Sequence, residues 1–165
     1  DNPLGGKWNY EEENRKPLPS GIRIPCVTNS TPDSITKDIG DEVQKPYADH
    51  YGYIDEFRRA VTRRDALKLF DQFIEERLSK FGPFEDAMAA GQPFLFHSVL
   101  STPYPNTGLL CAREVCEKLP ETCRRGSSAE GFVRQIIGWG EFVRIYYEAL
   151  MPDTLKTNYF GYMVS

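Results

Sequence analysis

The sequence lacks the features that mark several classes of protein. No apolar run approaches the roughly 20 residues that a transmembrane helix needs, and the start, DNPLGGKWNY, has neither the basic nor the apolar region of a signal peptide. Basic residues do not outnumber acidic ones: the net charge is −4, so binding to nucleic acid would need a local basic patch. The chain also has no initiator Met and no recognisable domain end. We expect a fragment of a longer cytoplasmic protein.

Cysteine is also scarce. Four cysteines are few for a secreted scaffold of 165 residues, and reduced thiols fit this number better. The spacings between Cys111, Cys116 and Cys123 match no zinc or iron–sulfur pattern, and Pro120 interrupts any helix that would join the last two. We therefore expect no metal site among these cysteines.

The residues that are present divide the chain into two parts. Residues 1–61 carry many Pro, Gly, Asn, Asp, Ser and Thr residues and no sustained period, which is typical of an irregular connector between two bodies. Residues 62–165 have the 3.6-residue apolar spacing of helices. The predicted fold is mainly α, a helical portion of a domain preceded by a long irregular connector.

Several helices can be placed within the second part. Residues 62–82 form the strongest, with Thr62 as N-cap and Asp65 three residues later. Shorter helices are expected at 84–91, 94–101 and 109–119. The last helix, 127–152, begins with a capping box from Ser127 to Glu130, and its apolar residues cover more than one face. We expect it to lie in the interior of the domain.

That last helix contains an unusual stretch, GWG, in which Trp139 lies between Gly138 and Gly140. Each glycine in the middle of a helix is less favourable than alanine by about 1 kcal/mol. Trp139 is one of only two tryptophans in the chain. A bare backbone around a large flat ring indicates a functional reason for the pattern.

Other chemistry is sparse. No GxGxxG, P-loop or HExxH motif is present, and no nucleophile, base and acid can be grouped. His97, Ser98 and Ser101 lie close together in FLFHSVLS, either as a half-buried helix whose hydroxyls bond its own backbone or as an anion site. Spacing alone favours the first interpretation. Paired arginines, including Arg58–Arg59 and Arg63–Arg64, fit a solvated helix entry better than phosphate contacts.

Four blocks in order carry a family resemblance: GGKWNYEEENRKPLP, GPFEDAMAAGQPFLFHSVLS, NTGLLCAREVC and EGFVRQIIGWGEFVR. They resemble the photolyase–cryptochrome superfamily, and most of all its bacterial branch of iron–sulfur (6-4) photolyases and cryptochromes. The resemblance covers nearly the whole chain. It implies the interdomain connector (1–61) and the N-terminal part of the helical FAD-binding domain (62–165) of a protein roughly three times as long.

The resemblance also implies roles for single residues. His97, Ser98 and Ser101 match the block that contacts the FAD diphosphate, which raises the anion-site interpretation above the other, and Asn106 continues that block. Trp139 matches the tryptophan of the family's Trp-Arg-Glu motif, on the floor of the pocket for the flavin and a flipped lesion base. The remaining implied site residues are Gln135 for the cofactor, and Arg134 and Arg144 for DNA.

Several positions depart from the family pattern. Gly140 stands where the family usually has Arg, whose hydrogen bonds a glycine cannot replace. Ile145 occupies a usual glycine position, and Pro105 stands where an apolar residue is expected. Each change touches the wall of the implied pocket.

The implied function is light-driven repair of DNA by a flavin-dependent (6-4)-type photolyase, or light sensing by a cryptochrome. FAD and damaged DNA are the implied partners, with no membrane partner. The 4Fe–4S cluster and the lumazine-type antenna of this branch would be held by missing N- and C-terminal parts, and the fragment alone would be inactive as an enzyme. The alternative is a truncated, non-catalytic helical remnant that binds neither flavin nor DNA tightly.

Overall fold

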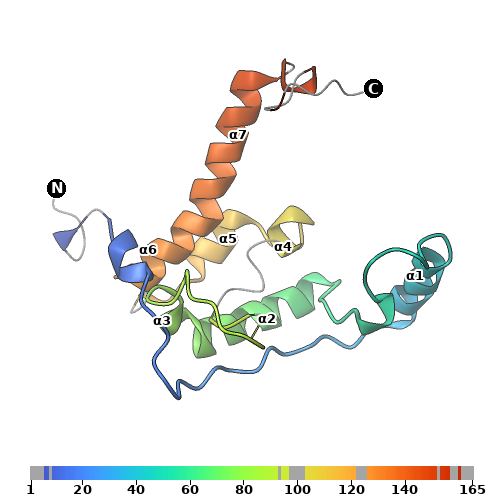
Figure 1. Ribbon diagram of the computed structural model, residues 1–165, viewed down its shortest axis with the longest axis horizontal. Coiled ribbons are helices and arrows are strands. Elements are labelled where there is room, and N and C mark those ends of the chain that lie inside the picture. Colours follow the sequence, from blue (N-terminus) through green and yellow to red (C-terminus); the bar gives the residue numbers. More distant parts are fainter. Residues whose placement is uncertain are drawn as a thin grey trace.

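The fold is known from a computed structural model, which describes residues 6–7, 9–92, 94–96, 103–121, 126–151, 153–156 and 160. Within these ranges the chain forms helices and no strand, apart from one isolated bridge between Ala89 and Gln92. The prediction of a mainly α fold is confirmed. Figure 1 shows a central body of short helices, with one helix projecting from it and another at its far end.

Helix α2 (Arg63–Glu76) begins where the sequence predicts. The Thr62 hydroxyl accepts the backbone N–H of Asp65 at 3.2 Å and donates to the Asp65 carboxylate at 2.7 Å. The predicted helix nevertheless breaks at Arg77, which has φ −120°, and continues as the separate turn α3 (Leu78–Phe81). The expected single helix is therefore two elements.

Four phenylalanines make the centre of the core. Phe132 stacks against Phe70 and lies 5.0 Å from Phe73 between ring centroids, and Phe81 meets it edge-on. Burial of aromatic rings is the largest stabilising contribution that such small helices can make. The other buried members of the cluster come from α2, from α3, from residue 60 and from the segment around α5 (Ala112–Glu117): Ala60, Ala66, Leu78, Leu110, Val115 and Leu119.

Helix α6 (Ser127–Val133) carries Phe132 into this core and approaches the end of α3 very closely. The Ser128 hydroxyl accepts the N–H of Gly82 and donates to the Ser79 carbonyl. A Cβ at Gly82 would lie 2.4 Å from the backbone nitrogen of Ser128, so this crossing requires a glycine. The predicted capping box is wrong, because Gly126 is the N-cap, with φ +99° and no side chain to offer.

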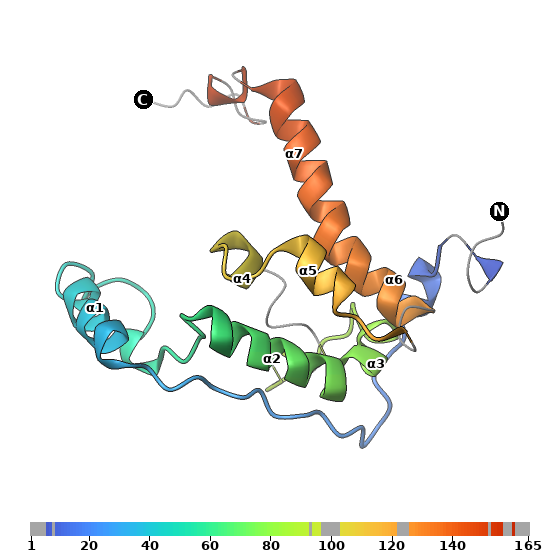
Figure 2. The same ribbon diagram turned by 180° about the vertical axis from the view of Figure 1, so that it is seen from behind.

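The long C-terminal helix is not one regular helix. A π-helical turn (η5, Arg134–Gly138) joins α6 to α7 (Trp139–Leu150). Figures 1 and 2 show α7 projecting away from α2, α3 and α5 in both views. Every residue of α7 is exposed, whereas Phe132 and two other residues of α6 are buried, so the expectation of an interior helix is confirmed for α6 and wrong for α7.

The connector runs along the body and is fixed to it by hydrogen bonds and ion pairs. Lys16 N–H donates to the Pro83 carbonyl, and the buried Arg77 guanidinium donates to the Pro25 carbonyl at 2.7 Å. Apolar connector residues pack on a second small cluster made of Phe84, Leu95 and Phe96. The connector therefore lies as a strap over the body.

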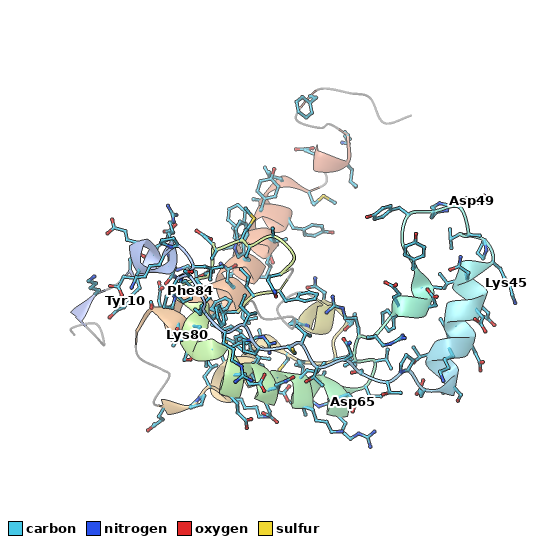
Figure 3. All side chains as sticks on the ribbon, turned by 60° about the horizontal axis from the view of Figure 1, so that its bottom comes forward. Tyr10, Lys45, Asp49, Asp65, Lys80 and Phe84 are labelled. Atoms are coloured by element: carbon cyan, nitrogen blue, oxygen red, sulfur yellow. The ribbon has the colours of Figure 1, made fainter. Side chains whose placement is uncertain are left out.

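The connector also contains a helix that its composition does not suggest. Helix α1 (Ser34–Gln44) is capped by Asp33, whose carboxylate accepts the N–H of Thr36 at 2.8 Å. It packs against the short turn η3 (Ile54–Glu56) and buries none of its own residues. In Figure 3 Lys45 and Asp49 mark this arm, far from Tyr10, Lys80 and Phe84 at the other end of the molecule.

Two shorter predictions also differ from the structure. The sequence predicts a helix at 84–91, but the structure has turns at 84–86 and 90–91 and the isolated bridge at Ala89. Helix α4 (Pro103–Asn106) lies between the helices that the sequence predicts at 94–101 and 109–119. Most of the helix expected at 94–101 lies outside the described residues.

Candidate functional site

Of the predicted anion site, the structure describes only the residues on either side. His97, Ser98 and Ser101 lie outside the described residues, so their implied contacts with FAD stay predictions. Leu95, which enters the block, is buried and has φ +39°, a conformation that costs a non-glycine residue about 1–3 kcal/mol. Strain of this kind concentrates at functional sites. On the other side of the block Asn106 is exposed at the end of α4, where it is accessible to a ligand.

Trp139 lies at the start of α7 with 59% of its surface exposed. Its ring meets Phe142 edge-on at 5.9 Å between centroids, and Phe142 stacks on Tyr146 at 6.2 Å. Together with Val143 and Leu150 these residues follow the i, i+3, i+4 spacing of one helix face. We call these five residues the aromatic face of α7.

The two glycines beside Trp139 differ in their surroundings. A Cβ at Gly138 would meet the Arg134 side chain at 3.4 Å, whereas one at Gly140 would meet nothing within 4 Å. The close neighbour of Gly138 is therefore a side chain of the preceding turn of the same helix. At Gly140, the position of the family's Arg, there is open space for a long side chain.

The opposite face of α7 carries a short charged network. Arg144 donates to the Glu141 carboxylate at 2.7 Å and to Glu148 at 2.8 Å. The hydrogen bonds from Arg144 lower the pKa of Glu141, and those carboxylates raise the pKa of Arg144. Its predicted role in DNA binding would require the guanidinium to exchange these partners for phosphate.

Gln135 and Arg134 have partners on the body instead. Gln135 Nε2 donates to the Glu85 carboxylate, which also accepts from Asn14 Nδ2 at 3.3 Å. Gly131 leaves room for this cluster, since a Cβ there would lie 2.8 Å from Glu85 Oε2 and 2.9 Å from Asn14 Nδ2. The structure thus turns Gln135 towards the body and leaves Trp139, one turn later, exposed.

Arg134 pairs with Glu130 and lies 3.7 Å from Glu11 of the turn η2 (Glu11–Asn14). Like Arg144, it is engaged by carboxylates, so its predicted contact with DNA stays a prediction. Glu85 could not be predicted as the partner of Gln135 and Asn14, because only the fold brings it together with these residues, which lie 50 and 71 positions away. The nearby Gly131, unexplained in mid-helix, was the available signal.

The other charged candidates fit structural roles. Arg63 donates to Glu114 and to the Leu109 carbonyl, which ties α2 to α5, and Arg59 lies over the Phe94 ring at 5.0 Å. Arg58 donates to the backbone carbonyls of Asp55 and Phe57. These contacts support the interpretation of the arginine pairs as helix-entry residues.

The described part of the chain contains neither a group of residues that could hold a metal ion nor a helix that could span a membrane. None of its His, Cys, Asp and Glu residues gather in a group of three or more that could hold a metal ion. Cys26 and Cys111 are exposed free thiols, and Cys116 is a half-buried one whose pKa is raised by burial. Cys123 is not among the described residues. No helix of that same part has the length and apolar character needed to cross a bilayer.

One open groove of the described part of the chain lies elsewhere. It has a volume of about 1240 Å³ and lies between α1 and the segment 53–62. None of the residues predicted for FAD or DNA lines it. The sequence-predicted residues on α7 therefore form a surface in this chain, and the structure does not gather them into an enclosed pocket.

Comparison with known proteins supplies the context for this surface. A family model described as deoxyribodipyrimidine photo-lyase-related protein matches residues 1–58. A (6-4) photolyase of Agrobacterium fabrum (strain C58) is 40% identical over 164 residues, which are 97% of this chain and 32% of that protein. An uncharacterised protein, R853, of Acanthamoeba polyphaga mimivirus is 37% identical over 83 residues, 47% of this chain and 62% of the viral one.

The chain thus spans about a third of the length of the bacterial relative that it matches. The likeness includes the connector, the phenylalanine core and the helix of Trp139, since it extends over nearly all 165 residues. On this evidence the chain belongs to the photolyase-related proteins.

Proposed function

We propose that these residues are the connector (1–61) and the first part of the helical FAD-binding domain (62–165) of a light-driven, flavin-dependent photolyase of the (6-4) type or of a cryptochrome-like photoreceptor. The observation that carries this proposal is the 40% identity to a (6-4) photolyase over 97% of the chain. The exposed ring of Trp139 supports it, because a flat aromatic surface is what a flavin or a flipped base would stack on.

The chain's own residues would bind and orient the cofactor and the substrate. Ser98 and Ser101, with His97 and Asn106, would hold the FAD diphosphate through hydroxyl, ring and amide groups. When bound and reduced, FAD supplies the light-excited electron for the repair of a lesion. Asn106 and Trp139 fit this role in that both are exposed and accessible to a ligand.

Trp139 would offer a stacking surface, and stacking of a base on an aromatic ring contributes about 1–3 kcal/mol. Gln135 would set the position of this part of the helix through its bond to Glu85. Arg134 and Arg144 would contact phosphates of damaged DNA after leaving their present carboxylate partners. The 4Fe–4S cluster and the lumazine-type antenna would belong to other parts of a longer, cytoplasmic protein.

Reconstitution with FAD tests the proposal. We expect the purified chain, grafted into the matching segment of the Agrobacterium relative, to retain FAD and absorb near 450 nm, about where oxidised flavin absorbs. Trp139→Ala should lower FAD or lesion binding with a modest loss of stability, since the ring is exposed. Gly140→Arg should raise affinity, and Gly140→Ala, which gains helix propensity but no charge, is its matched control. If the two Gly140 variants bind FAD or the lesion equally well, Gly140 does not lie in the wall of a ligand pocket, and this part of the proposal is wrong.

A non-catalytic helical remnant is the second candidate. Gly140 favours it, because this glycine leaves open space where the family has Arg. The viral relative also favours it, because 83 matched residues are already 62% of that protein, which is therefore short. A graft that folds cooperatively but stays colourless with excess FAD would support the remnant. A yellow graft supports the photolyase-like function.

A further inference from the structure

One carboxylate joins three parts of the chain that are far apart in the sequence. Glu85 follows α3, and its Oε1 accepts a hydrogen bond from Nε2 of Gln135 in the π turn η5. Its Oε2 accepts from Nδ2 of Asn14 in the connector turn η2 at 3.3 Å. The two partners lie 50 and 71 positions away from Glu85, so this cluster fixes the π turn to both the body and the connector.

The cluster is tightly built. Asn14 is buried, with 5% of its surface exposed. Gly131 in α6 lies directly against it, since a Cβ there would be 2.8 Å from Glu85 Oε2 and 2.9 Å from Asn14 Nδ2. A glycine within a helix is less favourable than alanine, and a buried amide is less favourable than an apolar side chain. Packing alone would require neither, so the cluster serves the position of its members.

The chemistry of a carboxylate determines how both amides are turned. A carboxylate accepts hydrogen bonds, whereas an amide has one accepting and one donating end. Both amides therefore direct their nitrogen towards Glu85. Asn14 keeps this direction even though its Oδ1 is then buried with no hydrogen-bond partner among the described residues. In Gln135, which is only half-buried, the same constraint leaves Oε1 as the free end that a ligand can reach.

That free end lies beside the exposed ring of Trp139. Gln135 is four residues before Trp139, and residues four apart on a helix share a face, so a flat ring stacked on Trp139 can present its edge to Gln135. Flavins and thymine-type bases have the same edge, an imide N–H between two carbonyls. A free Oε1 accepts from that N–H, whereas a free amide nitrogen would favour the carbonyls. The direction of the amide therefore selects between ring edges.

We propose that Glu85 is a positioning residue, which holds the Gln135 amide so that Oε1 is offered to the imide N–H of a ring stacked on Trp139. Asn14 supports the Glu85 carboxylate from the connector side. The inference rests on the proposed function for the identity of the ring, a flavin or a thymine-type base. Glu85 acts through Gln135 and does not itself contact the ring.

The direction of the amide is tested in the chain itself, without ligand. In ¹H–¹⁵N spectra the side-chain N–H groups of Gln135 and Asn14 should be shifted and should exchange slowly with water, because a carboxylate binds them more strongly than a neutral acceptor does. Glu85→Gln should reverse both effects together. Glu75→Gln, which removes the same charge from the exposed side of α2, should reverse neither. Unchanged Gln135 resonances in Glu85→Gln would overturn the proposal.

Ligand discrimination is tested in the graft into the Agrobacterium relative. The probes are FAD against 3-methyl-FAD, and a duplex with one unpaired thymine against the same duplex with N3-methylthymine, so that a methyl group replaces the imide hydrogen. The graft should prefer the N–H form of one pair by about tenfold or more, and that pair identifies the ring. Glu85→Gln should reduce the preference to about twofold at an unchanged melting temperature, whereas Glu75→Gln should keep it.

Exchange of the two groups supplies the rescue. In Glu85→Gln combined with Gln135→Glu, carboxylate and amide change places and position 135 still offers a free oxygen, so the N–H preference should return. A preference that survives Glu85→Gln alone would refute the positioning role. A graft that binds FAD or the thymine duplex without preferring the N–H form of either pair refutes it too, while the proposed function stands. A graft that binds neither ring contradicts the proposed function and this inference together.

Discussion

The phenylalanine core and the aromatic face of α7 are made of the same kinds of residue at similar helical spacings, yet the core is buried and the face of α7 is exposed to solvent. The core rings come from three helices that meet one another, and Phe132 touches Phe70, Phe73 and Phe81. The ring contacts of α7 among the described residues join Trp139 to Phe142 and Phe142 to Tyr146 along one helix. The difference shows that spacing defines an apolar face, whereas partners from distant parts of the sequence decide whether it is buried.

The largest expected difference between the two regions is the loss of stability when one ring is removed from each. Phe132→Ala leaves a cavity among three other rings and should destabilise the chain by about 3–5 kcal/mol. Phe142→Ala, on a side chain that is 59% exposed, should change the free energy of unfolding little. Urea denaturation monitored by circular dichroism measures both. Similar losses for the two variants would mean that α7 is covered in the isolated chain.

The glycines of the two regions offer a second contrast. Gly82→Ala places a Cβ within 2.6 Å of the Ser127 and Ser128 backbone, which has to move, and should destabilise by about 1–3 kcal/mol. Gly140→Ala meets nothing and should stabilise α7 by up to about 1 kcal/mol. Thermal melts of the two variants should shift in opposite directions. A stabilising Gly82→Ala would show that α3 and α6 do not cross as closely as the structure has them.

The Thr62–Asp65 cap of α2, which belongs to the buried region, should make the stability of that region depend on pH. The Thr62 hydroxyl, followed by Lys68, holds the pKa of Asp65 below its ordinary value of 3.8. Because the pKa of Asp65 is lower in the folded state, the unfolded chain binds the proton more readily. The stability that the ionised carboxylate contributes is therefore lost as pH falls through the folded pKa. The melting-temperature difference between the native chain and Asp65→Asn should therefore shrink between about pH 6 and about pH 3. An unchanged difference would contradict the Thr62–Asp65 bond.

Thiol reactivity gives the smallest and most local test. Burial raises the pKa of Cys116, which lies on α5 against the core, so its thiol stays protonated and reacts slowly. Cys26 and Cys111 are exposed. We expect iodoacetamide to modify these two first at about pH 8, as followed by peptide mass spectrometry. Equal rates at Cys111 and Cys116 would indicate that α5 does not pack as described.

Local signals in the sequence predict some elements well. Thr62 and Asp65 identify the start of α2, and the apolar period predicts its buried side. Helix α1 was missed because Ile35, Ile39 and Val43 are its only apolar residues in a polar stretch, although they are spaced by four. The Asp33 cap was the signal that could have found it.

Other features depend on contacts that no local pattern contains. The apolar residues of α7 cover much of its surface, but their number does not reveal which part of the fold would cover them. The π turn is also hidden, since its residues read as ordinary helix formers up to Gly138. The bond between Gln135 and Glu85 joins residues 50 positions apart, and only the fold brings them together.

The place of Phe132 in the sequence has a consequence for the order in which the chain is made. Phe70, Phe73 and Phe81 are synthesised before the ring that they enclose, which follows about 50 residues after the last of them. Until α6 has been made, the apolar side of α2 and α3 stays uncovered, and the loop that must close is long. During synthesis these three rings therefore stay exposed to water for longer than rings whose partners are close in the sequence, and apolar surface that is exposed in this way favours aggregation.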